Sequence, residues 1–449
     1  ALKPDDPVGH DNLGLALEAL QDFEGAERAY QQALEVSEAA ERDIYYNRLG
    51  VFCYRQGRHV EAIGYYRHAI EYREQAVYYE NLGLAYEMLE KWEEAGAAYH
   101  KAVDIAEADD MAGHQNRLGV YYYKIGESQL AIEHYQRAIQ HDAEPAVYYE
   151  NLALAFEAIG DSKNALQAYR QALERSPSEP LYTNKLGLLY LAQEDYESAE
   201  GYFKKTIALK PDDPIGYENL ATTLNHQGLT DQALAWMQQA WEHSDQKDLY
   251  HNLIGNLYYQ SFEDKKAAEQ YRKAIELNPT VPIYFENLAL ITEGLGNYEE
   301  AINAIEKVME LQPDNPNYIN RLGQLYYRQD KFSEALPHFK RATQINPNNA
   351  YFWENVGLTS EKLNLMPEAE SAYLRALAAA APEEKHVYHN LLGVFYYTIG
   401  ETQNAIDAYR QALQLQPENS IYHENLGSAY VQMKDFEAAN QAWYLALQY

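Results

Sequence analysis

Thirteen asparagines recur along the chain at intervals of 33 to 35 residues. A side-chain amide both donates and accepts hydrogen bonds, so a regular row of amides can pair with a peptide backbone whatever its side chains are. The row therefore predicts either binding of an extended protein segment or hydrogen bonds to the backbone of neighbouring parts of the same chain. Its members are Asn12, Asn47, Asn81, Asn116, Asn151, Asn184, Asn219, Asn252, Asn287, Asn320, Asn355, Asn390 and Asn425.

Charged residues and tyrosines accompany these asparagines with a period of two. An acid precedes every other asparagine: Asp11, Glu80, Glu150, Glu218, Glu286, Glu354 and Glu424. A base follows four of the remaining asparagines: Arg48, Arg117, Lys185 and Arg321. A tyrosine stands seven residues after five of them: Tyr54, Tyr123, Tyr259, Tyr327 and Tyr397. The acids and bases either bind a partner or pair with each other and fix the register between neighbouring units.

The elements that position these residues follow from an internal repeat of about 34 residues. Repeats start near residues 7, 43, 76, 112, 146, 180, 214, 248, 282, 316, 350, 386 and 420. Numbered from these starts, position 8 is always Gly or Ala, position 20 is always Ala and position 24 is usually aromatic. Small residues let two helices approach closely, and large ones fill the space around them. We expect an all-α chain of helix pairs, with the acids at position 5 of odd repeats.

This pattern resembles the tetratricopeptide repeat family along essentially the whole chain. The resemblance implies a right-handed α-solenoid superhelix of about 13 antiparallel helix pairs, forming one continuous array over residues 1–449. It also implies that the first helix of each pair lines a concave groove. The array is similar to that of the O-linked N-acetylglucosamine transferase, where an asparagine at position 6 binds the ligand backbone. Odd-repeat asparagines match that position, whereas even-repeat asparagines stand one position earlier.

The amino-acid composition limits the classes of partner that the chain is expected to bind. The chain has 36 Lys and Arg against 68 Asp and Glu, for a net charge of -32, which argues against nucleic acid and favours basic or extended protein segments. No apolar run approaches the roughly 18 residues of a membrane span, and no secretory signal peptide is expected. The single cysteine, Cys53, excludes a disulfide scaffold and is expected to be buried and inert.

Two functions remain open at this stage. Because all thirteen repeats are explained by packing positions, and no phosphate loop or zinc motif occurs, we expect no enzymatic activity, metal or cofactor. The first function is a protein-interaction scaffold. The second is self-assembly into filaments or tubes, with end-to-end contacts made by Leu2, Pro4, Trp443, Tyr444, Leu447 and Tyr449.

Overall fold

A computed structural model describes residues 5–449, which form 26 α-helices and no strand. The predicted all-α fold of helix pairs is confirmed. The chain divides into two compact units, Ala1–Leu229 and Thr230–Tyr449. The continuity of the array from one unit to the next stays a prediction.

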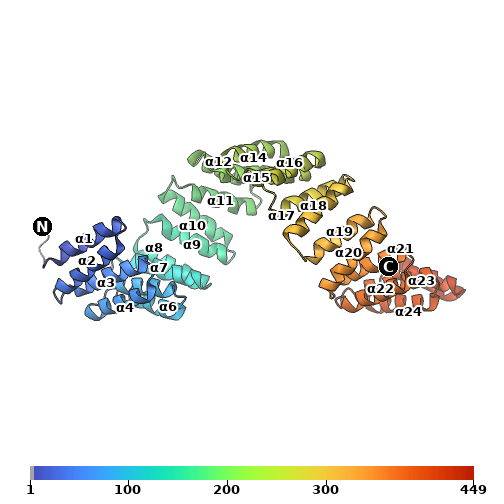
Figure 1. The fold of residues 1–449 in the computed structure, drawn as a ribbon, viewed down its shortest axis with the longest axis horizontal. Coiled ribbons are helices and arrows are strands. Elements are labelled where there is room, and N and C mark those ends of the chain that lie inside the picture. The colour runs from blue at the N-terminus through green and yellow to red at the C-terminus, as the bar shows by residue number, and fades with distance from the viewer. Residues whose placement is uncertain (1–4) are drawn as a thin grey trace. The chain divides into compact units, whose positions relative to one another are not determined.

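The first unit contains thirteen helices, drawn from blue to green in Figure 1. They are α1 (Pro7–Ala19), α2 (Phe23–Val36), α3 (Arg42–Arg55), α4 (His59–Tyr72), α5 (Ala76–Glu87), α6 (Trp92–Ile105), α7 (Met111–Lys124), α8 (Ser128–His141), α9 (Ala146–Ala158), α10 (Ser162–Arg175), α11 (Pro180–Ala192), α12 (Tyr196–Leu209) and α13 (Pro214–His226).

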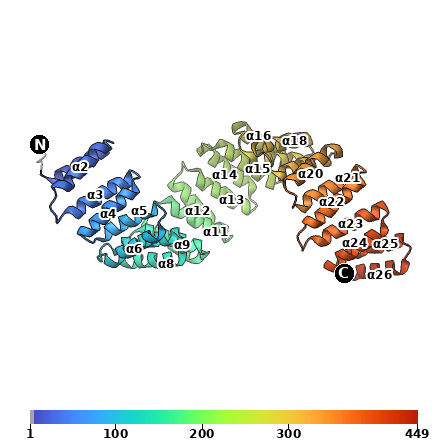
Figure 2. The same cartoon turned by 60° about the horizontal axis from the view of Figure 1, so that its bottom comes forward.

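The second unit contains the other thirteen helices, which Figure 2 shows from green to red. They are α14 (Thr230–His243), α15 (Lys247–Gln260), α16 (Asp264–Leu277), α17 (Pro282–Gly294), α18 (Tyr298–Leu311), α19 (Pro316–Tyr327), α20 (Phe332–Ile345), α21 (Ala350–Lys362), α22 (Met366–Ala379), α23 (Lys385–Ile399), α24 (Thr402–Leu415), α25 (Ser420–Gln432) and α26 (Phe436–Gln448).

Within each unit, every helix packs against the helices before and after it in the chain. Several first helices also contact the first helix of the next repeat, as α3 does with α5, α5 with α7, and α7 with α9. Their side chains therefore meet across repeat junctions, as nearest-neighbour packing in a solenoid requires.

A close contact between position 8 and position 24 holds the two helices of a repeat together. A Cβ atom added to Gly357 would lie 2.4 Å from Cε1 of Tyr373, which is itself fully buried. Gly50 stands in the same relation to Tyr66. The small residue at position 8 thus makes room for a large ring, as its conserved spacing within the sequence predicts.

The turn between the two helices has the same backbone conformation in all thirteen repeats. Position 15 has a positive φ at Gln21, Gly57, Glu90, Gly126, Gly160, Glu194, Gly228, Phe262, Gly296, Asp330, Asn364, Gly400 and Lys434. Glycine adopts this left-handed region without the steric cost that side chains bear. Phe262 is the one apolar residue in the set.

We predict that Gly357→Val destabilises the protein by about 1–3 kcal/mol, because its side chain must displace the Tyr373 ring. Chemical denaturation followed by circular dichroism measures the change. Gly357→Ala should cost less, since repeat 5 already holds Ala153 at position 8 of a repeat whose position 24 is the buried Tyr169. Equal stability of the valine variant and the wild type would contradict this packing account.

Candidate protein-binding surface

The predicted asparagine row is arranged as six pairs across repeat junctions. In each pair the amide nitrogen of an odd-repeat asparagine donates to Oδ1 of the preceding even-repeat asparagine, at 2.7 to 2.9 Å. The pairs are Asn81–Asn47, Asn151–Asn116, Asn219–Asn184, Asn287–Asn252, Asn355–Asn320 and Asn425–Asn390. Asn12 is exposed. The row is thus a set of mutually bonded amides rather than thirteen free ones.

The half-buried asparagine pairs still have hydrogen-bonding capacity, unlike Asn355–Asn320, whose two residues are buried. Two amides joined by one bond leave one NH₂ group and one carbonyl oxygen without that partner, whichever amide donates. The pairs in the first unit, such as Asn151–Asn116, are half-buried, so part of each pair reaches the protein surface. The one-position offset between odd and even repeats brings the two amides face to face.

The odd-repeat acids accept hydrogen bonds from position 3 of the next even repeat. Tyr182 donates to Glu150 at 3.0 Å, and Tyr318 donates to Glu286 at 2.6 Å. His114 takes the place of tyrosine in repeat 4, with Nδ1 2.7 Å from Glu80. These position-3 donors are not among the candidate binding residues predicted from the sequence.

A sequence signal for these position-3 donors does exist. Tyrosine stands two residues before the asparagine in five even repeats, at Tyr45, Tyr182, Tyr250, Tyr318 and Tyr388. Two residues along a helix do not share a face, so Tyr and Asn reach different neighbours from one turn. The recurrence of a hydroxyl donor at this register marks the partner of the odd-repeat acid.

Two of the odd-repeat acids are neutralised by bases of the next repeat. Arg48 binds Asp11 at 2.9 Å, and Arg117 lies 3.4 Å from Glu80. These are the cross-junction pairs that the self-pairing interpretation describes. Burial raises the pKa of Glu80, but the His114 hydrogen bond and the Arg117 charge outweigh it and hold that pKa below its ordinary value.

In other repeats the base forms an ion pair with a different acid. Lys185 binds Glu157 at position 12, 3.2 Å away, and Arg321 binds Glu293 at the same position of repeat 9. Glu150 and Glu286 therefore keep tyrosine hydroxyls as partners, and no ion pair to either is present among residues 5–449. No basic side chain of the described residues neutralises these two carboxylates.

Glu354 belongs to the same class. Burial raises the pKa of its carboxyl above the ordinary value, and the Tyr388 hydrogen bond, which favours the charged form, only partly offsets that effect. No cation pairs with Glu354 within the described part of the chain. The last acid of the series, Glu424, is exposed, and Glu218 is half-buried.

The position-12 tyrosines differ in their availability. Tyr123 and Tyr259 are exposed, whereas Tyr54, Tyr327 and Tyr397 are half-buried. The ring of Tyr54 packs on His59 with centroids 5.2 Å apart, and that of Tyr327 packs on Phe332 at 5.0 Å. Tyr123 and Tyr259 are therefore the members of this stripe that lie open to a ligand.

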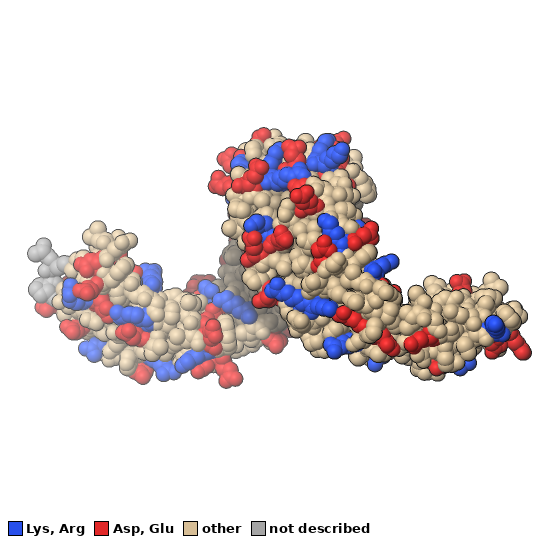
Figure 3. All heavy atoms as spheres, turned by 45° about the vertical axis from the view of Figure 1, so that its right-hand side comes forward, with Lys and Arg blue, Asp and Glu red and all other residues tan. Residues whose placement is uncertain are grey.

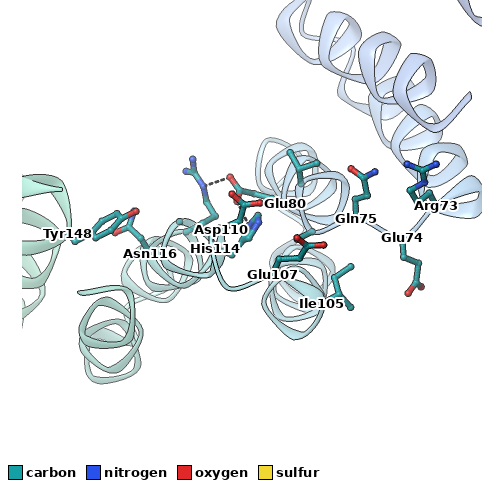
Figure 4. A pocket seen from close by; sticks show the side chains of 14 residues that line it. Arg73, Glu74, Gln75, Glu80, Ile105, Glu107, Asp110, His114, Asn116 and Tyr148 are labelled. Carbon is teal, nitrogen blue, oxygen red and sulfur yellow. Dashed lines mark hydrogen bonds and ion pairs between the residues drawn. The ribbon is translucent and has the colours of Figure 1, made fainter. Parts of the chain in front are cut away.

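A hollow of about 830 Å³ in the first unit is lined by several of the candidate binding residues predicted from the sequence. Glu80, Asn116 and Arg117 line it, together with Glu107 and Asp110 of the turn before α7. Figure 4 shows the carboxylates of Glu80, Glu107 and Asp110 gathered near the His114 ring, with Tyr148 at one end. Figure 3 shows acidic and basic side chains interspersed over one face of the molecule.

The described residues hold no candidate metal centre. No group of three or more His, Cys, Asp or Glu side chains within residues 5–449 is arranged to hold a metal ion. Cys53 is buried as predicted, and burial raises the pKa of its thiol, although Arg58 donates to Sγ at 2.9 Å. Of the helices described, none is both long and apolar enough to cross a bilayer.

Comparison with models of known protein families identifies the family of these repeats. Models described as tetratricopeptide repeat or TPR repeat match most of the chain, at residues 12–77, 74–144, 116–180, 184–246, 248–281, 281–348, 320–384 and 393–434. The chain belongs to the tetratricopeptide repeat family. Such repeats are generally non-catalytic modules that bind other proteins, so the chain is a protein-interaction scaffold in this general sense.

Solved structures with related folds were also found, although no curated protein sequence matches the chain. One is the C-terminal part of a TPR repeat-containing protein from Cytophaga hutchinsonii, with 19% identity, 55% of this chain and 99% of that chain covered, and a TM-score of 0.47. Another is the MamA protein, with 24% identity, 39% and 94% covered, and a TM-score of 0.36. A third is the Cut9–Hcn1 hetero-tetramer of the APC/C, with 14% identity, 100% and 94% covered, and a TM-score of 0.38.

A double-mutant cycle on Asn320 and Asn355 tests the pairing of the amides, because both residues are buried. We predict that each alanine substitution costs about 1–3 kcal/mol, since the remaining amide loses its buried partner. The double variant should cost less than the sum by about 0.5–1.5 kcal/mol. Chemical denaturation gives the four stabilities, with Asn12→Ala as an exposed control that should change little. Strict additivity would mean that the amides do not interact.

Proposed function

We propose that the protein is a non-enzymatic scaffold whose first helices bind an extended, basic segment of a partner protein. The observation that carries this proposal is the state of Glu150 and Glu286, which accept tyrosine O–H bonds and have no cation beside them. A neutral donor orients a carboxylate without cancelling its charge. Each such acid therefore offers an oriented negative charge to a lysine or arginine.

The surroundings of these acids strengthen such a contact. Glu150, Glu286 and Glu354 are all half-buried, so solvent screens their charges less than it screens exposed ones. The raised pKa of Glu354 shows that its ionised form is disfavoured in the free protein. A partner cation would stabilise the ionised form, and this charge interaction would contribute to binding wherever the carboxyl is ionised.

The asparagine pairs supply the complementary contact to a backbone. In each half-buried pair, one NH₂ and one carbonyl group can bond a peptide C=O and N–H whatever the peptide side chains are. Such pairs recur every two repeats and alternate with the acids. This alternation favours a segment held by its backbone at one junction and by a basic side chain at the next.

We predict that replacing Glu150, Glu286 and Glu354 together with glutamine weakens binding of a fluorescein-labelled peptide of alternating Lys and Ser by about tenfold or more, near 1.4 kcal/mol. Glutamine keeps an oxygen for the tyrosine bonds and removes only the charge. Fluorescence anisotropy measures the affinity. The matched control replaces Glu133, Glu299 and Glu437, which are exposed acids on second helices, and makes the same change in net charge.

The pH dependence of this binding provides an internal check. Because the pKa of Glu354 is raised, its carboxyl takes up a proton at a higher pH than an ordinary glutamate as the solution is acidified. Affinity for the basic peptide should therefore fall in that range for the wild type, and less so for Glu354→Gln. If the triple variant binds like the control variant at neutral pH, the acids are not the binding groups.

Self-assembly is the second candidate, and the apolar side chains on α26 favour it. Leu447 is 87% exposed, Tyr444 61%, Tyr449 56% and Trp443 41%. The other predicted contacts, Leu2 and Pro4, lie outside the described residues. A net charge of -32 opposes association, and salt screens it. Self-assembly therefore predicts that the sedimentation coefficient of the wild type rises with salt concentration. The Leu447→Asp variant should keep the sedimentation coefficient of the monomer. A wild type that stays monomeric at every salt concentration would exclude it.

A further inference from the structure

A second hollow lies on the first helices of repeats 8 to 10 in the second unit. It has a volume of about 550 Å³ and opens between α15, α17 and α19. Tyr259, Phe262 and Leu290 are among its apolar lining residues. Its charged lining residues are Asp264, Glu293, Arg321 and Arg328. Tyr259 and Arg321 are candidate binding residues predicted from the sequence.

Phe262 is an outlier in this array on two independent grounds. Its side chain is 91% exposed, and its φ of 60° lies in the left-handed region. The other twelve repeats place glycine or a polar residue at position 15. Both the exposed ring and the backbone conformation oppose phenylalanine here, so neither packing nor turn geometry accounts for it. Such a residue indicates a contact made with something else.

Two arginines that line the hollow share one covered acid, and the side chain of Arg328 is the more exposed of the two. Arg328 binds Glu293 at 2.8 Å, and Arg321 binds the same carboxylate. The Glu293 side chain is only 4% exposed, whereas that of Arg328 is 58% exposed. The acid is covered and the guanidinium groups face outward. Repeat 10, residues 316–349, holds five Lys and Arg against two Asp and Glu, the reverse of the balance in the whole chain.

We propose that this hollow anchors the partner segment through a bulky apolar residue that stands next to an aspartate or glutamate. The apolar side chain packs between Phe262 and Leu290, and the neighbouring carboxylate binds the exposed guanidinium of Arg328. This inference rests on the proposed scaffold function and adds a specific anchor to it. A second copy of this chain fits the hollow less well, because two molecules of charge -32 repel each other.

Four labelled peptides test the anchor by fluorescence anisotropy. They share one Lys/Ser background and differ in a central dipeptide, which is Leu-Glu, Leu-Gln, Ser-Glu or Ser-Gln. We expect the Leu-Glu peptide to bind at least tenfold more tightly than the Ser-Gln peptide, with the other two between them. A Leu-Glu peptide that binds no more tightly than either single-feature peptide would overturn the paired anchor.

The Phe262→Asn variant shows whether the gain comes from this hollow. Asparagine tolerates the left-handed backbone, so the turn is retained and the midpoint of thermal unfolding should stay the same or rise. The variant should lose the tenfold gain of the Leu-Glu centre while binding the Ser-Gln peptide as the wild type does. Phe436→Asn, which alters another exposed phenylalanine in the same unit, should leave the gain intact. A gain that survives in Phe262→Asn would overturn the assignment.

The experiments distinguish failure of this anchor from failure of the proposed binding of a basic segment. If the wild type binds no Lys/Ser peptide, the groove proposal fails, and a Leu-Glu centre in a Ser/Gly background without lysine then tests the hollow alone. If the wild type binds that peptide and Phe262→Asn does not, the result would support the hollow as the anchor. If the wild type does not bind it, the proposal would be overturned. Concentration-dependent self-association that Phe262→Asn abolishes would assign the hollow to a second copy and also overturn the proposal.

Discussion

The arrangement of functional groups depends on the contact between a small residue at position 8 and a large ring at position 24. At Gly357 and Gly50 there is no room for even one more carbon beside that ring. This contact holds the first and second helices of a repeat at close range, and the repeats then stack through their neighbours. Neighbouring first helices such as α5 and α7 consequently touch, and position 5 of one repeat reaches positions 3 and 6 of the next.

Stacking gives the first-helix surface a period of two repeats with two kinds of junction. One kind joins two asparagines, as in Asn151–Asn116, and is neutral. The other joins an acid to a tyrosine, a histidine or a base, and its net charge depends on which donor is present. Arginine at Asp11 cancels the charge, whereas tyrosine at Glu150 leaves it in place. The choice of donor therefore decides which junctions can attract a basic partner.

The sequence predicted the repeat, its small and large positions and the burial of Cys53, because each is a matter of spacing and residue size along one chain. It did not predict that Asn47 and Asn81 bond each other, since that depends on the distance between helices of neighbouring repeats. For the same reason the partners of Arg321 could not be chosen between Glu286 and Glu293. The left-handed turn at position 15 was visible only where glycine marked it, so Phe262 was overlooked.

The central claim is that the charged junctions of the first helices, and not the second helices, receive a basic segment. Amide hydrogen exchange of the full chain with and without the Lys/Ser peptide tests it directly, because binding slows local opening where contacts form. The account predicts slower exchange in α9, α17 and α21, which hold Glu150, Glu286 and Glu354, and unchanged exchange in α10, α18 and α22. Slower exchange in the second helices alone, or no change anywhere at saturating peptide, would contradict it.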